Sequence, residues 1–209
     1  MMRVQVISLR ATKFPWMAMR GGPRTPAWSL AVLLLATTAA ARPDGLSVRY
    51  FAFGSNMASS VMVGRRGMRP LEPPSAALVR GHELGFTLPG VPLVEPAFAS
   101  LERSSDAEAA CHGVLYTLSL GDWARLCASE GVPTGAYRIV TVPTERYDDG
   151  AVVSAYSLTA GLLRSPVSLS PSERYLKLLQ QGALEVGLRD EYQQMLREIE
   201  TSPFSRRPT

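Results

Sequence analysis

Short apolar runs separated by glycine and proline fill most of the chain after residue 46, and this pattern is typical of strands. The run Ser47–Phe53 reads SVRYFAF and ends at the turn-forming triplet Gly54-Ser55-Asn56. The segment that follows, 58–75, carries several prolines and glycines and is expected to hold a short helix at most, then loop. Further strands are predicted over 77–88, 97–102, 113–118, 136–143 and 152–159.

The spacing of apolar residues becomes helical in two places. Ser119 can form a capping box with Asp122, and the helix that follows is expected to end before Gly131. A second helix is expected to begin within the segment 170–173 (SPSE), with a second capping box and proline at the first helical position. Gly187 separates it from a last helix.

The order of these elements favours an α+β fold. Strands come first with hairpin-length connections, one helix lies between them, and helices end the chain, so the pattern lacks a βαβ alternation. A small mixed, mostly antiparallel β-barrel or sheet with flanking helices is therefore predicted. One domain is expected over 46–201, followed by a tail at 202–209.

The first 41 residues have the composition of a targeting segment. An apolar stretch of about a dozen residues, too short to span a bilayer, follows a basic region without acids and precedes the triplet 39–41 (AAA). A cleaved secretory signal or an organelle transit segment, for example a plastid one, is predicted, with no stable membrane insertion afterwards. Translation from Met17 or Met19 would instead leave the protein in the cytoplasm.

Charge and cysteine content narrow the range of functions. Five of the 22 basic residues lie in 1–41, which leaves 17 basic against 18 acidic residues in 42–209, a net charge of −1. A nucleic-acid partner is therefore not expected. Cys111 and Cys127 are too few for a disulfide framework, and Cys111 should point away from its neighbour His112 on a strand.

Two positions could support chemistry. The turn at Gly54 can leave backbone N–H groups free to face a carboxylate or an oxyanion, although the local composition alone favours an ordinary tight turn. Glu130 lies in the last helical turn before Gly131, where the helix dipole disfavours a carboxylate, so that its removal should leave stability unchanged or slightly higher. A local rule broken in this way indicates function, while a solvated surface glutamate is the simpler alternative.

Taken in order, these segments resemble the γ-glutamylcyclotransferase (AIG2-like) superfamily. The resemblance rests on the segment 50–56 (YFAFGSN), on the segment 113–116 (GVLY) leading to Leu126-x-x-x-Glu130-Gly131, and on Tyr137. It continues through Pro171 before Tyr175, Gly182-Ala183, Gly187-Leu188 and Glu191-Tyr192, and so covers residues 50–196. The triplet Gly-Ser-Asn is similar to the branch that acts on γ-glutamyl amino acids, whereas the stretch 64–100 resembles plant and algal members. Phe53 departs from the family, which commonly has tyrosine there.

The resemblance implies a mixed β-barrel enzyme that needs no metal or organic cofactor and acts on a small γ-glutamyl molecule. The α-amino group of the γ-glutamyl unit would attack its own γ-carbonyl, which yields 5-oxoproline and a free amino acid. Glu130 would be the general base and proton shuttle, and Tyr137 is expected to line the same cavity. The implied substrate-binding residues are Tyr50, Phe51, Ala52, Phe53, Gly54, Ser55 and Tyr175.

Three alternatives stay open at this point. The chain could be a non-catalytic module that binds γ-glutamyl metabolites, a cyclotransferase for γ-glutamylamines, or an amidohydrolase that uses the same glutamate. The oligomeric state is not predicted.

Overall fold

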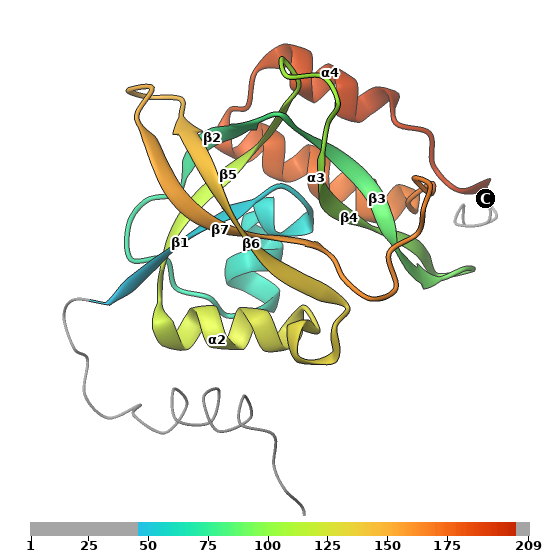
Figure 1. Cartoon of the computed structure of the whole chain (residues 1–209), viewed down its shortest axis with the longest axis horizontal. Coiled ribbons are helices and arrows are strands. Elements are labelled where there is room, and N and C mark those ends of the chain that lie inside the picture. Colours follow the sequence, from blue (N-terminus) through green and yellow to red (C-terminus); the bar gives the residue numbers. More distant parts are fainter. Residues whose placement is uncertain (1–45, 204–209) are drawn as a thin grey trace, which may run out of the picture.

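Five strands form a closed barrel in the computed structural model, which describes residues 46–203 (Figure 1). Each strand runs antiparallel to its neighbours, except that β1 and β7 are parallel and meet at Tyr50 and Tyr156. The predicted α+β class and the mixed, mostly antiparallel barrel are thereby confirmed. In barrel order the strands are β1 (Ser47–Ala52), β5 (Ala110–Ser119), β2 (Ser75–Arg80), β6 (Tyr137–Arg146) and β7 (Val152–Ala160).

The predicted leader, residues 1–41, lies outside the described residues, as does most of the predicted tail. The compartment and the removal of the leader therefore stay predictions. Within residues 46–203, none of the helices is both long enough and apolar enough to cross a membrane.

A separate two-stranded ribbon packs beside the barrel and corrects one prediction. The run 77–88 is not one strand, because it divides between β2 and β3 (His82–Val91), and β3 pairs with β4 (Glu95–Arg103). Gly81 makes the turn with a φ of +64°, a conformation that disfavours other residues. The polar residues that flank this turn, Arg80, His82 and Glu83, are the signal in the sequence that the prediction missed.

The helices begin and end close to their predicted positions. Helix α2 (Leu120–Ser129) is capped by Ser119, whose Oγ accepts from the Asp122 amide at 3.1 Å. The reciprocal half of the predicted capping box is absent from the described residues, because the Asp122 carboxylate accepts instead from the Arg69 amide and from Arg125. The short helix η3 (Val132–Thr134) follows α2.

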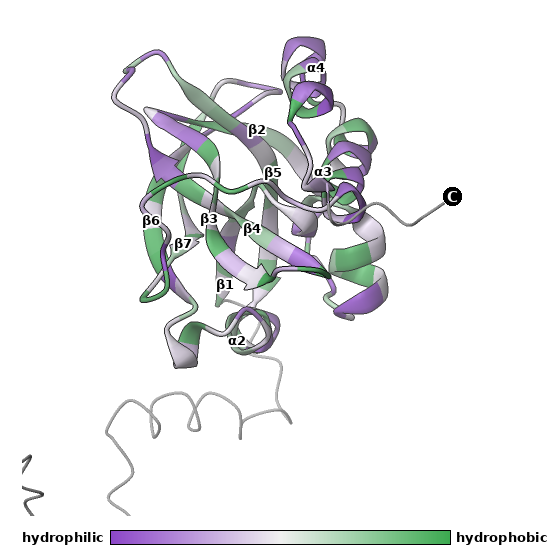
Figure 2. Cartoon of the chain, turned by 90° about the vertical axis from the view of Figure 1, so that its right-hand side faces the viewer, coloured by the Kyte–Doolittle hydropathy of each residue, from purple (hydrophilic) through white to green (hydrophobic). Residues whose placement is uncertain are grey.

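Helix α3 (Glu173–Val186) starts two residues later than the second capping box predicts. Ser172 is its N-cap and accepts from the Tyr175 amide at 2.9 Å, so Pro171 precedes the helix instead of opening it. Gly187 ends α3 as expected, and α4 (Asp190–Glu198) completes the chain. Figure 2 shows purple and green turns alternating along α3 and α4, as expected of helices that bury one face.

Two short helices carry the chain away from the end of β1. Helix η1 (Ser55–Met57) follows Gly54 directly, and the π-helical segment η2 (Ser60–Arg65) comes next. Gly182 of α3 lies against the backbone of Met57 and Ala58, so that α3 holds η1 in place. In Figure 1, α2 lies below the barrel, and α3 and α4 lie on the side away from it.

Candidate active site

Glu130 occupies the C-cap of α2, where the chain leaves the helix for the left-handed turn at Gly131. Its amide donates to the Leu126 carbonyl at 2.9 Å, which fixes the backbone from which the side chain projects. The side chain is only 13% exposed. The carboxylate is therefore held inside the protein and is not a solvated group at a frayed helix end.

Two residues from the segment after β1 hold this carboxylate. The Asn56 side-chain Nδ2 donates to Glu130 Oε1 at 2.7 Å, and the Arg66 guanidinium lies 2.6 Å from the same oxygen. Arg66 also donates to Ser129 Oγ. Arg66, which is distant in the sequence, thus supplies the positive partner that the helix end lacks locally.

The amide of Asn56 connects Glu130 to Tyr50. A carboxylate can only accept hydrogen bonds, so the atom of Asn56 that faces Glu130 must be Nδ2. The same Nδ2 donates to the Tyr50 hydroxyl at 3.0 Å. Both hydrogens of the amide are then used, and the hydrogen of the Tyr50 hydroxyl must point elsewhere.

Several hydrogen-bonding atoms in this network have no partner. Glu130 Oε2 accepts no hydrogen bond from residues 46–203, whereas Asn56 and the shortest Arg66 contact reach Oε1. Over the same residues, Asn56 Oδ1 and Arg66 Nε are the two buried side-chain nitrogen or oxygen atoms that lack one. Unsatisfied polar atoms are thus concentrated around one carboxylate.

Three tyrosine hydroxyls surround the carboxylate and stay protonated. Burial and then the charge of Glu130 raise the pKa of Tyr50. Burial, followed by Tyr175 and Glu130, raises the pKa of Tyr137. Burial raises the pKa of Tyr175 to about 12, with Glu130 acting in the same direction. All three side chains can therefore donate hydrogen bonds at neutral pH.

The ribbon of β3 and β4 supplies the backbone that orients two of these tyrosines. The Tyr137 hydroxyl donates to the Ala99 carbonyl at 2.6 Å, and the Tyr175 hydroxyl accepts from the Ala99 amide at 3.2 Å. A Cβ atom on Gly54 would lie 3.1 Å from Ala99 Cβ and 3.2 Å from the Tyr175 hydroxyl. A side chain at this position would therefore crowd β4 and α3, which favours glycine where the turn approaches them.

The turn provides one free backbone donor. The Gly54 amide N–H has no hydrogen-bond partner within the described part of the chain, whereas Ser55 bonds to the Tyr175 hydroxyl. The predicted residues Tyr50, Gly54, Ser55, Tyr137 and Tyr175 thus lie together around Glu130.

Three further predicted residues do not present side chains to this group. Phe51 and Ala52 are fully buried in the core, and Phe53 is 4% exposed with its ring 6.4 Å from that of Phe51. Their side chains are therefore part of the core. Asn56 and Arg66 are absent from the predicted site. Asn56 was expected only as part of a turn, and Arg66 lies in the segment 58–75, which was expected to hold a short helix at most and then loop.

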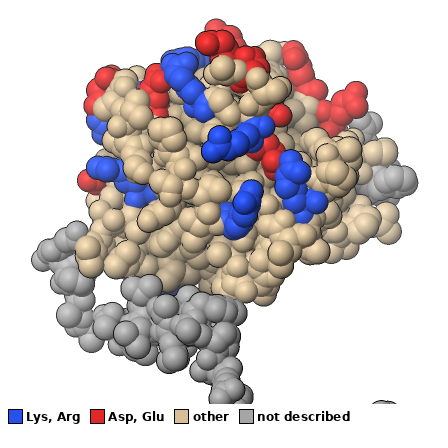
Figure 3. Space-filling view, viewed as in Figure 1, with Lys and Arg blue, Asp and Glu red and all other residues tan. Residues whose placement is uncertain are grey.

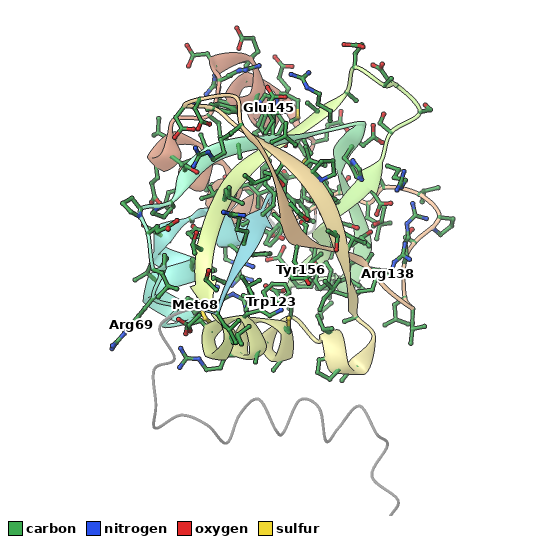
Figure 4. The ribbon with its side chains drawn as sticks, turned by 60° about the vertical axis from the view of Figure 1, so that its left-hand side comes forward. Met68, Arg69, Trp123, Arg138, Glu145 and Tyr156 are labelled. Carbon is green, nitrogen blue, oxygen red and sulfur yellow. The ribbon has the colours of Figure 1, made fainter. Side chains whose placement is uncertain are left out.

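An aromatic row borders the site on the side of α2. Trp123 lies 5.6 Å from the rings of both Tyr50 and Tyr156, and Figure 4 shows Trp123 of α2 next to Tyr156 of β7. Tyr50 is also stacked on Tyr116, whose hydroxyl donates to the Asn56 carbonyl at 3.0 Å. These contacts hold the Tyr50 ring and the Asn56 backbone, and both residues belong to the hydrogen-bond network of Glu130.

Two surface hollows lie away from Glu130. One, of about 460 Å³, is lined by α3, Arg197 of α4 and the residues after α4, and the other, of about 310 Å³, lies between β1, β6 and β7. On the face shown in Figure 3, lysine and arginine side chains are separated by uncharged and acidic ones. Among residues 46–203, no three His, Cys, Asp or Glu side chains are grouped as a metal site would require.

The cysteines are free and make no hydrogen bond to Glu130, Asn56 or Tyr50 within residues 46–203. Burial raises the pKa of the Cys111 thiol to about 12, and its hydroxyl contact is with Tyr192 at 3.6 Å. His112 instead bonds to the Tyr147 hydroxyl. No hydrogen bond joins the Cys111 thiol to the His112 ring in the described region, in agreement with the prediction that they form no catalytic dyad.

The chain is similar to proteins of the AIG2-like family and to γ-glutamyl cyclotransferases. The model of the AIG2-like family matches residues 110–196. The γ-glutamyl cyclotransferase verK of Clonostachys rogersoniana is 32% identical over 148 residues, which cover 61% of this chain and 80% of that protein. The human γ-glutamylcyclotransferase is 28% identical over 174 residues, covering 78% of this chain and 84% of the human protein.

Other relatives are longer, and a solved structure agrees in fold. The γ-glutamyl cyclotransferase gliK of Claviceps purpurea is 32% identical over 147 residues, with 68% of this chain aligned. The aligned region spans 65% of that protein and 57% of gliK of Aspergillus fumigatus. A solved γ-glutamyl cyclotransferase superposes with a TM-score of 0.66 at 23% identity, over 78% of this chain and 94% of the solved one.

Proposed function

Because the chain belongs to the γ-glutamylcyclotransferase (AIG2-like) family, we propose that it converts γ-glutamyl amino acids into 5-oxoproline and a free amino acid, with Glu130 as general base. The observation that carries this proposal is the state of the Glu130 carboxylate, which has one oxygen held by Asn56 and Arg66 and the other unoccupied. An oxygen that is free within a rigid, largely buried carboxylate can accept a proton.

The reaction is an intramolecular acyl transfer. The α-amino nitrogen of the γ-glutamyl group forms a bond to its own γ-carbonyl carbon and passes a proton to Glu130 Oε2. The amide bond to the leaving amino acid then breaks, and Glu130 returns the proton to the leaving nitrogen. Atoms and charge balance without water or a co-reactant, and Glu130 ends in the state in which it began.

The developing oxyanion needs a hydrogen-bond donor, and two are available. Tyr50 stays protonated and its hydroxyl hydrogen is not used by Asn56, while the Gly54 amide N–H has no partner in residues 46–203. Preformed donors of this kind stabilise charge that develops in the transition state. Ser55, Tyr137 and Tyr175 would complete the walls around the γ-glutamyl group, and Phe51, Ala52 and Phe53 would contribute backbone atoms alone.

The test is a substrate panel. The chain would be incubated with γ-glutamyl dipeptides, γ-glutamyl-lysine and glutathione, and 5-oxoproline would be quantified. We expect release from the γ-glutamyl dipeptides. Release from γ-glutamyl-lysine alone would favour the γ-glutamylamine reading, and saturable binding of the panel with no 5-oxoproline would favour the binding module.

A further inference from the structure

We infer that Asn56 and Arg66 are positioning residues, which hold Glu130 Oε1 so that Oε2 alone can take the proton of the substrate amine. The inference rests on the proposed function and assigns the two residues that sequence reasoning missed. Both donors reach the same oxygen, at 2.7 Å from Asn56 and 2.6 Å from Arg66. A carboxylate held at one oxygen cannot rotate to exchange Oε1 and Oε2, so its free lone pairs keep one direction.

The unsatisfied atoms of these two residues support a functional clamp over a merely stabilising ion pair. Asn56 Oδ1 and Arg66 Nε are buried without partners, although other buried side-chain groups of the described region are bonded. A contact selected for stability would satisfy its own donors and acceptors, because each unsatisfied group costs folding free energy. The positions of Asn56 and Arg66 therefore favour their contacts with Glu130 over the full satisfaction of their own hydrogen-bonding atoms.

The chain itself offers a matched control. Arg65 and Arg66 are adjacent, but Arg65 is exposed on η2 and has no hydrogen bond or ion pair within residues 46–203, whereas the Arg66 side chain is 18% exposed and turned to Glu130. The two neighbouring arginines thus differ in whether the side chain contacts the Glu130 carboxylate.

The experiment compares steady-state 5-oxoproline release by the wild type and by the variants Arg66→Met, Arg66→Lys and Arg65→Met. We expect Arg66→Met to lower kcat by roughly 10- to 100-fold with KM changed less than threefold, because small misplacements of a catalytic group have effects of this size. Arg66→Lys should be intermediate, since it keeps the charge but not the planar fork. Arg65→Met should stay within twofold of the wild type.

Two further measurements separate positioning from stability. Low millimolar guanidinium ion should restore part of the kcat of Arg66→Ala and none of that of Glu130→Gln, and a role in folding alone predicts no rescue. In the Glu130→Gln background, Arg66→Met should have no further effect on kcat, because its effect passes through Glu130.

The inference is overturned if folded Arg66→Met keeps kcat within threefold of the wild type, or if Arg66→Ala is not rescued by guanidinium. Absence of 5-oxoproline from the wild type with every γ-glutamyl compound would instead refute the proposed function, which is a separate and recognisable result. Should Arg66→Met fail to fold, Arg66→Lys and the rescue of Arg66→Ala at reduced temperature decide the same question.

Discussion

Two glutamates of this protein are buried to the same extent and paired with arginine, yet their surroundings differ. Glu102 is 12% exposed with Arg164 at 2.7 Å, and Glu130 is 13% exposed with Arg66 at 2.6 Å. Glu102 accepts from Thr87 and Ser100 at Oε1 and from Arg164 at Oε2, so both oxygens are occupied. Glu130 uses Oε1 alone.

Burial and an ion pair therefore do not by themselves distinguish the proposed general base from Glu102. The four donors of Glu102 join β3, β4 and the loop after β7, which is a structural role. Burial acts to raise the pKa of Glu102, but the hydrogen bonds from Arg164, Ser100 and Thr87 lower it overall. Glu130 lies instead among three protonated tyrosines and keeps a free oxygen. Under the proposed function, unfilled hydrogen-bonding capacity is the property that distinguishes Glu130 from Glu102.

The largest expected effect comes from neutralising each glutamate in turn. Glu130→Gln keeps the size of the side chain but cannot accept the proton of the amine, so kcat should fall by roughly 10²- to 10⁴-fold. Glu102→Gln should leave kcat within threefold, measured in the same 5-oxoproline assay. Equal losses in two folded variants would contradict the distinction.

Tyr50→Phe tests the proposed hydrogen-bond donor beside Glu130. Removing one donor to an oxyanion typically costs about 100-fold or more in kcat, and we expect roughly that loss. Tyr147→Phe is the control, because the Tyr147 hydroxyl bonds to His112 and not to the Glu130 network. A Tyr50→Phe protein with normal kcat would transfer the donor role to the Gly54 amide.

Gly54→Val tests whether the turn approaches the substrate. Its side chain would meet Ala99 and the Tyr175 hydroxyl, so kcat/KM should fall about tenfold or more, mainly through KM. Gly64→Val is the control, since the nearest atom to a Cβ there is 3.9 Å away. Similar losses in the two variants would mean that backbone strain alone explains the effect.

Of the two glutamate substitutions, Glu102→Gln should have the larger effect on stability, although it has the smaller effect on kcat. Glu102→Gln is expected to lower the free energy of unfolding by roughly 1–3 kcal/mol, and more than Glu130→Gln does, because four donors converge on Glu102 and two on Glu130. Urea unfolding of the three proteins measures this. A larger loss at Glu130 would make its network the structural one.

The pH dependence of stability gives the smallest effect. The pKa of Glu102 is lower in the folded protein than its unfolded value of about 4.3, so its contribution is fully present above that pH. The contribution is lost as the pH falls below about 4.3 and through the folded pKa. In Glu102→Gln, the free energy of unfolding should therefore fall less steeply with decreasing pH than in the wild type. The same pH dependence in both proteins would show that Glu102 does not contribute to it.

The sequence pattern predicted those strands, helix caps and helix ends that depend on residues close together in the chain. The strand Ser47–Ala52, the cap at Ser119 and the stop at Gly187 depend on neighbouring residues, and the structure has them where the sequence indicates. The break at Gly81 was missed, although the polar residues 80–83 (RGHE) interrupt the apolar pattern there and mark the turn between β2 and β3. The second cap lies at Ser172 because proline can precede a helix as well as open it.

The site was only half predictable for the same reason. Glu130 breaks a local rule and so could be singled out, and the family resemblance named the tyrosines. Its partners Asn56 and Arg66 lie 74 and 64 positions away along the chain, and spacing cannot reveal such contacts. Nothing in the sequence distinguishes Arg66 from Arg65, since the turn of η2 alone decides which one faces inward.

The most direct test of the central claim follows the fate of the γ-carbonyl in water enriched with ¹⁸O. A γ-glutamyl dipeptide would be converted by the wild type and by Glu130→Gln, and the products analysed by mass spectrometry. The account predicts unlabelled 5-oxoproline and no glutamate from the wild type, because the substrate's own amine is the nucleophile, and a rate lower by roughly 10²-fold or more from Glu130→Gln. Glutamate that carries ¹⁸O would show that water attacks and would contradict the cyclotransferase mechanism.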